Sequence, residues 1–111
     1  MIRILIADDH TIMREGLKRI LDGIEDIQVI GEAVDGFDTL DKVRHHEFDV
    51  LLMDLSMPGR SGVDLIRQIK DEFPKLPILI LTMHEEEQYA VRAIRAGARG
   101  YLTKESAGTQ L

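Results

Sequence analysis

Residues 50–54 read VLLMD, four apolar residues in a row followed directly by an acid. Two further runs have the same character, at residues 4–7 and 78–81. None of the three alternates between apolar and polar residues, as strands with one face in water do. Continuous apolar runs of this length are typical of strands that helices cover on both faces. The sequence therefore predicts an α/β domain with parallel central strands.

Two less regular runs complete a set of five strands. Residues 27–34 are interrupted by Gly31 and Glu32, and only a short run stands before Lys104. Interrupted and short strands are favoured at the edges of a sheet. We therefore expect these two strands at or near the edges.

Helical periodicity fills the segments between the strands. The clearest helix begins with Thr11 as its expected N-cap and ends near Gly23. Its apolar residues recur at helical spacing and predict one buried face: Met13, Leu17, Ile20, Leu21 and Ile24.

Three further helices are expected. Two of them carry Leu40 with Val43, and Leu65, Ile66, Ile69 and Phe73, with Pro74 ending the second. The fourth, at residues 85–96, has mainly alanine on its inner side, with Tyr89 and Val91 outside that stripe, and it ends near Gly97. We expect this fourth helix to be loosely packed and open to a partner or a movement.

Composition excludes several classes of protein. The chain has 111 residues, 44% of them hydrophobic and 31% charged, which fits one globular domain. With a net charge of −6 and no strong basic cluster, the chain is expected to bind nucleic acid poorly. The chain has no cysteine, no apolar run long enough to span a bilayer and no signal peptide. We therefore expect a cytoplasmic protein without membrane attachment.

The last residues are too few for a complete α/β series. Five right-handed strand–helix units would end with a fifth helix. After Lys104 only residues 105–111 follow, and at about 1.5 Å per residue they form at most about two helical turns. We therefore expect residues 1–111 to be one domain, largely without its fifth helix, cut from a larger protein.

Reactive side chains follow the expected strands directly. Asp8 and Asp9 follow the first strand, Asp54 the third, Thr82 the fourth and Lys104 the last. In an open parallel sheet, such groups meet beyond the carboxyl ends of the strands. Three carboxylates within ~4 Å repel by about 4 kcal/mol per pair at an effective dielectric of about 20, so either one is protonated or a cation lies among them. An oxygen cluster favours Mg²⁺, and a carboxylate beside it can attack phosphorus while Lys104 and Thr82 hold phosphoryl oxygens.

Four segments of the chain carry a further signal in combination. They read ADDH at residues 7–10, MDLSMPG at 53–59 with Gly62, LTMH at 81–84, and AGARGYLTK at 96–104. Together they resemble the receiver domain of two-component response regulators over nearly the whole chain. The first and last segments, with REGL at 14–17, are most similar to the NarL/FixJ subfamily, whose receivers precede a helix-turn-helix DNA-binding domain. The resemblance implies a flavodoxin-like (CheY-like), doubly wound sheet of five parallel strands in the order 2-1-3-4-5.

The resemblance also implies a metal-dependent phosphoacceptor. Asp54 would become 4-aspartylphosphate, with the phosphoryl group coming from a sensor histidine kinase. Mg²⁺ would be held by Asp8, Asp9, Asp54 and the backbone carbonyl of Ser56. Such a domain assists its own phosphorylation and turns over no external substrate, so it is not expected to be an enzyme.

The remaining implied roles concern the response to phosphorylation. Lys104 would contact the phosphoryl group, and Thr82 with Tyr101 would form the switch pair. His84 stands where receivers tune the access of water to the phosphoaspartate. We expect phosphorylation to favour a homodimer, and DNA to be bound only by a C-terminal domain outside this chain.

Other interpretations of single residues stay open. Aspartates at strand ends often cap the next helix, and a lysine at a strand end is usually solvated. His10 either touches the metal site or merely starts a helix, and His84 either tunes the site or is simply exposed. Gly59 and Gly62 are expected to shape the loop after Asp54 and to start the next helix.

Other functions are also possible. One is a degenerate receiver that serves only as a dimerisation module, although all five site residues are present. Another is a phosphatase of the haloacid-dehalogenase type, which needs a second acid two residues after its nucleophile; this chain has Ser56 there. A flavin-binding domain would place a phosphate where Asp8 and Asp9 would repel it.

Overall fold

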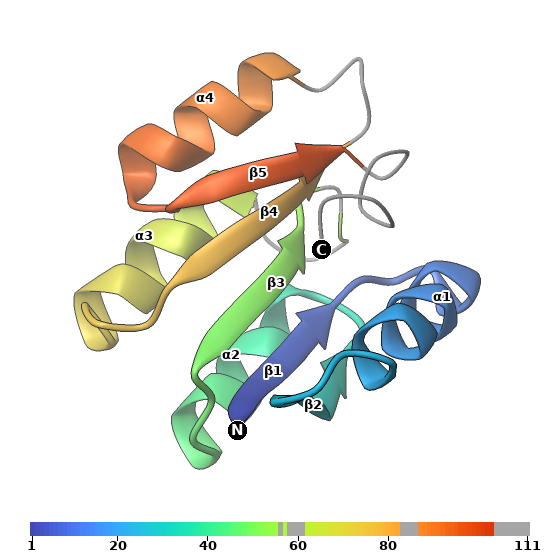
Figure 1. Ribbon diagram of the computed structural model, residues 1–111. Helices are drawn as coiled ribbons and strands as arrows, with labels where there is room; N and C mark the ends of the chain where they lie inside the picture. The colour runs from blue at the N-terminus through green and yellow to red at the C-terminus, as the bar shows by residue number, and fades with distance from the viewer. Residues whose placement is uncertain (56, 58–61, 83–86, 104–111) are drawn as a thin grey trace.

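The molecule is built on one sheet of five parallel strands (Figure 1). The computed structural model describes residues 1–55, 57, 62–82 and 87–103, without the side chains of residues 82, 87, 89, 102 and 103. The strands are β1 (Ile2–Ala7), β2 (Ile27–Ala33), β3 (Val50–Asp54), β4 (Ile78–Thr82) and β5 (Gly100–Thr103). Their order is β2-β1-β3-β4-β5, which confirms the expected topology, and the two irregular strands are the edges, as predicted.

The strand register aligns the carboxyl ends of the central strands. Ala7 of β1 pairs with Met53 of β3, and Asp54 pairs with Leu81 of β4. The first residues after these strands therefore stand at one edge of the sheet. At β2 the pairing with β1 shifts by one residue, between the pairs Ile4–Val29 and Leu5–Gly31, so the interruption seen in the sequence is a bulge.

Four helices connect the strands. They are α1 (Thr11–Asp22), α2 (Gly36–His45), α3 (Gly62–Glu72) and α4 (Glu87–Ala96). All four expected helices are thus present, and α4 begins at Glu87, after residues that lie outside the described part of the chain.

The start and the face of α1 differ from expectation. The N-cap is His10, not Thr11, because the Asp8 carboxylate accepts the His10 backbone N–H and turns the chain one residue earlier. Leu17 and Leu21 are buried, whereas Ile20 is 36% exposed. At 100° per residue, Ile20 lies about 60° around the helix from Leu17, on the side away from Leu21, and so falls outside the contact with the sheet.

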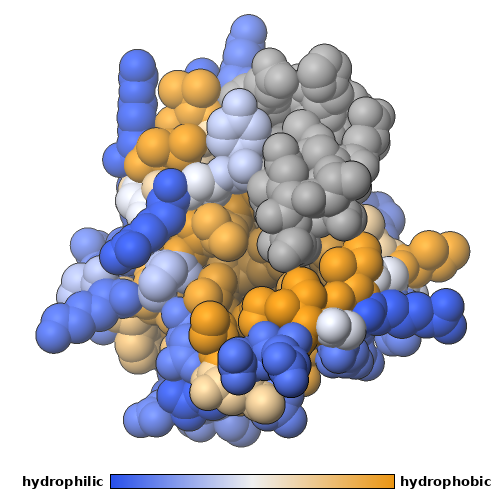
Figure 2. All heavy atoms as spheres, viewed as in Figure 1, coloured by the Kyte–Doolittle hydropathy of each residue, from blue (hydrophilic) through white to orange (hydrophobic). Residues whose placement is uncertain are grey.

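Successive residues of each strand pack on opposite faces of the sheet, and this creates two cores. On the α2, α3 and α4 side the buried strand residues include Leu5, Ala7, Leu51, Met53, Ile78 and Ile80. On the α1 side they are Ile4, Ile6, Leu52 and Leu81, packed against Leu17 and Leu21. Figure 2 shows apolar side chains gathered in the middle of the view, with hydrophilic side chains around much of the rim. The expectation about a fifth helix falls on residues 105–111, outside the described residues.

The inner side of α4 is made of small residues. Ala90 and Ala93 are fully buried, whereas Val91 and Ile94 are about half exposed on the outside. The helix ends at Ala96, and the next residue, Gly97, has a φ of +131°, which favours glycine. The predicted alanine stripe is therefore present, with little side-chain volume holding this helix to the sheet.

Among the described helices, none has both the length and the apolar composition to cross a membrane.

An ion pair joins α2 to α3. Arg44 donates from Nε and Nη2 to the two carboxylate oxygens of Glu72, at 2.8 and 2.7 Å. Hydrogen bonds from Arg44, and less strongly from Gln68, lower the pKa of Glu72 from its usual 4.5 to about 2. A pKa that is lower in the folded state stabilises the fold above the unfolded pKa, and this contribution disappears as pH falls through about 2.

We predict that Arg44→Met raises the Glu72 pKa toward its usual value. The unfolding free energy should be lower in Arg44→Met than in the wild type above about pH 5, and the difference should shrink as pH falls toward 2, because Glu72 becomes neutral. Carboxyl NMR titration and urea unfolding at each pH measure both effects. Arg67→Met, which removes an exposed pair with Asp64, is the control that should leave Glu72 unchanged. A Glu72 that titrates near 4.5 in the wild type would contradict the assignment.

Candidate functional site

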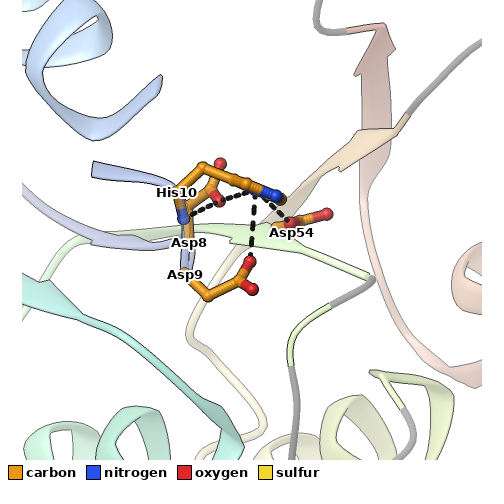
Figure 3. Close-up of side chains that lie close together, drawn as sticks. All are labelled: Asp8, Asp9, His10 and Asp54. Carbon is orange, nitrogen blue, oxygen red and sulfur yellow. Dashed lines mark hydrogen bonds and ion pairs between the residues drawn. The ribbon is translucent and has the colours of Figure 1, made fainter. Parts of the chain in front are cut away.

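Three acids lie together at the carboxyl end of the sheet (Figure 3). Asp54 is the last residue of β3, and Asp8 and Asp9 follow β1 directly. The side chains of Asp8 and Asp54 are fully buried, and that of Asp9 is 31% exposed. The backbone N–H of Asp8 donates to the Ala33 carbonyl at 3.0 Å, which holds the end of β1 against β2. The structure thus brings together the three acids that the sequence singled out.

His10 lies between these acids and α1. Its Nδ1 is 3.0 Å from Asp8 Oδ1, 3.2 Å from Asp9 Oδ1 and 3.8 Å from Asp54 Oδ2 (Figure 3). Its backbone N–H donates to the same Asp8 oxygen at 2.9 Å, and its carbonyl accepts the Arg14 N–H of the first helical turn. Of the two interpretations left open by the sequence, the structure shows both the helix start and direct contact with the acids.

The donor atoms fit a divalent cation. One carboxylate oxygen from each of Asp8, Asp9 and Asp54 and a ring nitrogen of His10 lie within 4.8 Å of one another. Oxygen ligands that leave room for water suit Mg²⁺. Ionised carboxylates ~4 Å apart repel by about 4 kcal/mol per pair at an effective dielectric of about 20, and a cation among them removes that repulsion. The residues present therefore suit the metal expected from the sequence.

The other expected site residues are only partly described. Tyr101 lies in β5 and is 41% exposed, so its ring is accessible at the edge of the sheet. Thr82 is the last residue of β4, and its side chain is outside the described part of the structure. Three further expectations fall on residues outside the described ranges: Ser56, His84 and Lys104.

Leu55, the residue after Asp54, lies close to the start of α3. Leu55 and Met57 are buried, and α3 begins at Gly62. A Cβ on Gly62 would lie 2.9 Å from the Leu55 carbonyl oxygen, closer than real Cβ atoms approach. Gly62 therefore allows α3 to start against the residue that follows Asp54, as predicted, whereas Gly59 lies outside the described residues.

Arg14 bonds to the backbone that carries the acids, a role that the sequence did not reveal. Its Nη1 donates to the backbone carbonyl of Asp8 at 2.7 Å, and its Nε donates to Glu32 of β2 at 3.2 Å. The side chain is only 13% exposed, so both bonds form largely out of water. Lys18, one turn later on α1, reaches the same Glu32 at 3.3 Å. Arg14 thus ties α1 and β2 to the backbone that carries Asp8.

Comparisons with known proteins give a consistent result. The family model of the response regulator receiver domain matches residues 4–111. The oxygen regulatory protein NreC of Staphylococcus haemolyticus is 46% identical over 110 residues, which are 98% of this chain and 51% of that protein. The chain therefore spans about half the length of the curated relatives that it matches.

Two solved structures share the whole fold. A two-component response regulator of the LuxR family from Aurantimonas has a TM-score of 0.90 and 37% identity, covering 97% of this chain and 77% of that one. RcsB from Salmonella enterica serovar Typhimurium, bound to the promoter rprA in the presence of the phosphomimetic BeF3−, has a TM-score of 0.89 and 34% identity. The match covers 98% of this chain and 63% of RcsB.

We predict that Arg14→Met lowers the unfolding free energy by about 1–3 kcal/mol, because the buried Asp8 carbonyl loses a charged donor. Lys18→Met is the matched control, since it also removes a bond to Glu32 but none to Asp8, and it should lower the unfolding free energy by clearly less. Urea unfolding followed by circular dichroism measures both variants. Equal losses would show that the contact with Glu32, rather than that with the Asp8 carbonyl, accounts for the effect.

Proposed function

Because the chain belongs to the response regulator receiver domain family, we propose that Asp54 accepts a phosphoryl group from a sensor histidine kinase. The observation that carries the proposal is the meeting of three acids, Asp8, Asp9 and Asp54, at the carboxyl end of the sheet. Histidine kinases of two-component systems act in the cytoplasm, so we place this chain there as well.

The three acids have two proposed roles: all of them hold the metal, and Asp54 also reacts. Asp8, Asp9 and Asp54, with the backbone carbonyl of Ser56, would hold Mg²⁺, which neutralises charge so that an anionic carboxylate can approach an anionic phosphoryl group. Asp9 is the most exposed of the three carboxylates, so solvent reaches it most easily. Asp54 is buried at the end of β3, where strand pairing fixes its position.

Asp54 is suited to be the nucleophile. One of its carboxylate oxygens attacks phosphorus, the bond from phosphorus to the donor's ring nitrogen breaks, and the electron pair of that bond stays on the nitrogen. Lys104 and the Thr82 hydroxyl hold the oxygens of the transferred group. Burial of Asp54 limits the access of water to the product acyl phosphate. The domain is modified once and turns over no external substrate.

The phosphorylated site would act on the α4–β5 side of the molecule. A phosphoryl group adds about two negative charges and draws the Thr82 hydroxyl toward it, which leaves space for Tyr101. Tyr101 is accessible in β5, and α4 beside it packs through alanines. Movement of these elements favours a homodimer, which pairs two C-terminal DNA-binding domains in the full-length protein, in keeping with the promoter-bound RcsB.

Two other functions have less support. A dimerisation module without phosphotransfer would not need three carboxylates kept close together against their repulsion. A phosphatase of the haloacid-dehalogenase type would need a second acid two residues after Asp54, where the chain has Ser56.

We predict that the wild type gains one phosphoryl mass from acetyl phosphate and Mg²⁺, and that Asp54→Asn gains none. Asp9→Asn should keep the fold, since it relieves carboxylate repulsion, and should be phosphorylated more slowly unless Mg²⁺ is raised. Intact-mass spectrometry over time measures all three proteins. Asp64→Asn, an exposed acid on α3, is the control that should behave as the wild type.

Two results would overturn this assignment. Phosphorylation of Asp54→Asn would place the phosphoacceptor elsewhere. A large loss of stability in metal-free Asp9→Asn would show that the acids serve as structural caps.

We also predict that a phosphoryl mimic strengthens self-association of the full-length protein. The association constant should rise between about 5-fold and 150-fold with BeF3− and Mg²⁺, the usual range for coupling between two sites. Sedimentation equilibrium measures it in both states. In Thr82→Ala the rise should be mostly lost, because no hydroxyl links the site to Tyr101. Equal constants with and without the mimic would rule out the coupling.

A further inference from the structure

The proposed phosphoacceptor role gives no function to the imidazole of His10. Its Nδ1 lies 3.0, 3.2 and 3.8 Å from single oxygens of Asp8, Asp9 and Asp54. These are the carboxylates proposed to hold the metal, and in Figure 3 the ring reaches over the space between them.

We propose that His10 Nδ1 is a fourth metal ligand, so that this site also binds the nitrogen-preferring divalent ions Co²⁺, Ni²⁺ and Zn²⁺, and binds them more tightly than Mg²⁺. The inference rests on the proposed function only in using the same three carboxylates. It adds a chemical class of metal that an all-oxygen site does not favour, because imidazole is a good ligand for these ions.

The spacing of the donor atoms suits shared coordination. Ligand atoms about 2.1 Å from one metal are about 3.0–3.5 Å apart when they are neighbours in octahedral or tetrahedral geometry. The distances from Nδ1 to the Asp8 and Asp9 oxygens lie in that range, and the distance to Asp54 is slightly longer. All four donor atoms lie within 4.8 Å of one another. Small side-chain adjustments are therefore enough to gather them around one ion.

The backbone already fixes where the ring stands. His10 is the N-cap of α1, its N–H is bonded to Asp8 and its carbonyl to the Arg14 N–H. Its side chain is 60% exposed, so an incoming hydrated ion can reach the ring from solvent. The ring binds through Nδ1 in the tautomer that carries its proton on Nε2. Metal binding thus replaces a hydrogen bond to Asp8 without moving the chain.

Pulsed EPR of the Mn²⁺-loaded wild type tests the ligand directly. We expect modulation from a bound ¹⁴N nucleus, which changes to the ¹⁵N pattern when histidine alone is ¹⁵N-labelled, and which is lost in His10→Asn. Asparagine is a good N-cap, so this variant should keep α1. His45→Asn is the matched control, because His45 Nδ1 lies 3.1 Å from one carboxylate, that of Asp41, and His45 is outside the group of potential metal ligands found among the described residues.

Calorimetry supplies a second measurement. His10→Asn should weaken Ni²⁺ binding by about 10-fold or more and change Mg²⁺ binding by less than about 3-fold, because only the first ion gains from imidazole. Mn²⁺ bound without a histidine ¹⁴N signal, together with Ni²⁺ binding that is unchanged in His10→Asn, would overturn the proposal for His10 and leave the Mg²⁺ site intact. A wild type that binds neither Mg²⁺ nor Mn²⁺ would overturn the metal site of the proposed function as well.

Discussion

Repulsion among the carboxylates of Asp8, Asp9 and Asp54 is the constraint that the surrounding structure has to balance. Two of these groups are fully buried, where water screens their charges least. Parallel pairing of β1 with β3 sets the two backbones side by side, and the bonds from Asp8 to Ala33 and from Arg14 to Asp8 keep the end of β1 in place. Bonds to the main chain therefore hold the end of β1, and with it Asp8, in position beside β3.

The sheet and the acidic cluster could be predicted from the sequence because both follow from simple rules. Unbroken apolar runs identified β1, β3 and β4, and the irregular run at Gly31 identified an edge strand that proved to carry a bulge. Once the strands are parallel, any residue directly after one of them lies at the same edge as the others. That Asp8 and Asp54 lie close together could therefore be predicted without knowing how the side chains pack.

Other features depended on side-chain contacts that the spacing of apolar residues does not encode. The bond from Arg14 to the Asp8 carbonyl spans a turn whose shape no periodicity encodes, although the position of Arg14 on the polar flank of α1 could have drawn attention to it. The helix starts at Thr11 after an N-cap at His10, because the Asp8 carboxylate accepts a hydrogen bond from the His10 backbone N–H. Ile20 looked like a core residue, but the contact between α1 and the sheet is narrower than the apolar stripe.

The alanine side of α4 has a consequence for the rate at which the domain changes state. Ala90 and Ala93 have no side-chain torsions to rearrange, so when the helix shifts along β4 and β5 these two residues break only weak dispersion contacts and change no rotamer of their own. Barriers for such movements are low. We expect α4 to shift on the sheet within microseconds to milliseconds, so that its amide resonances broaden rather than split into separate sets.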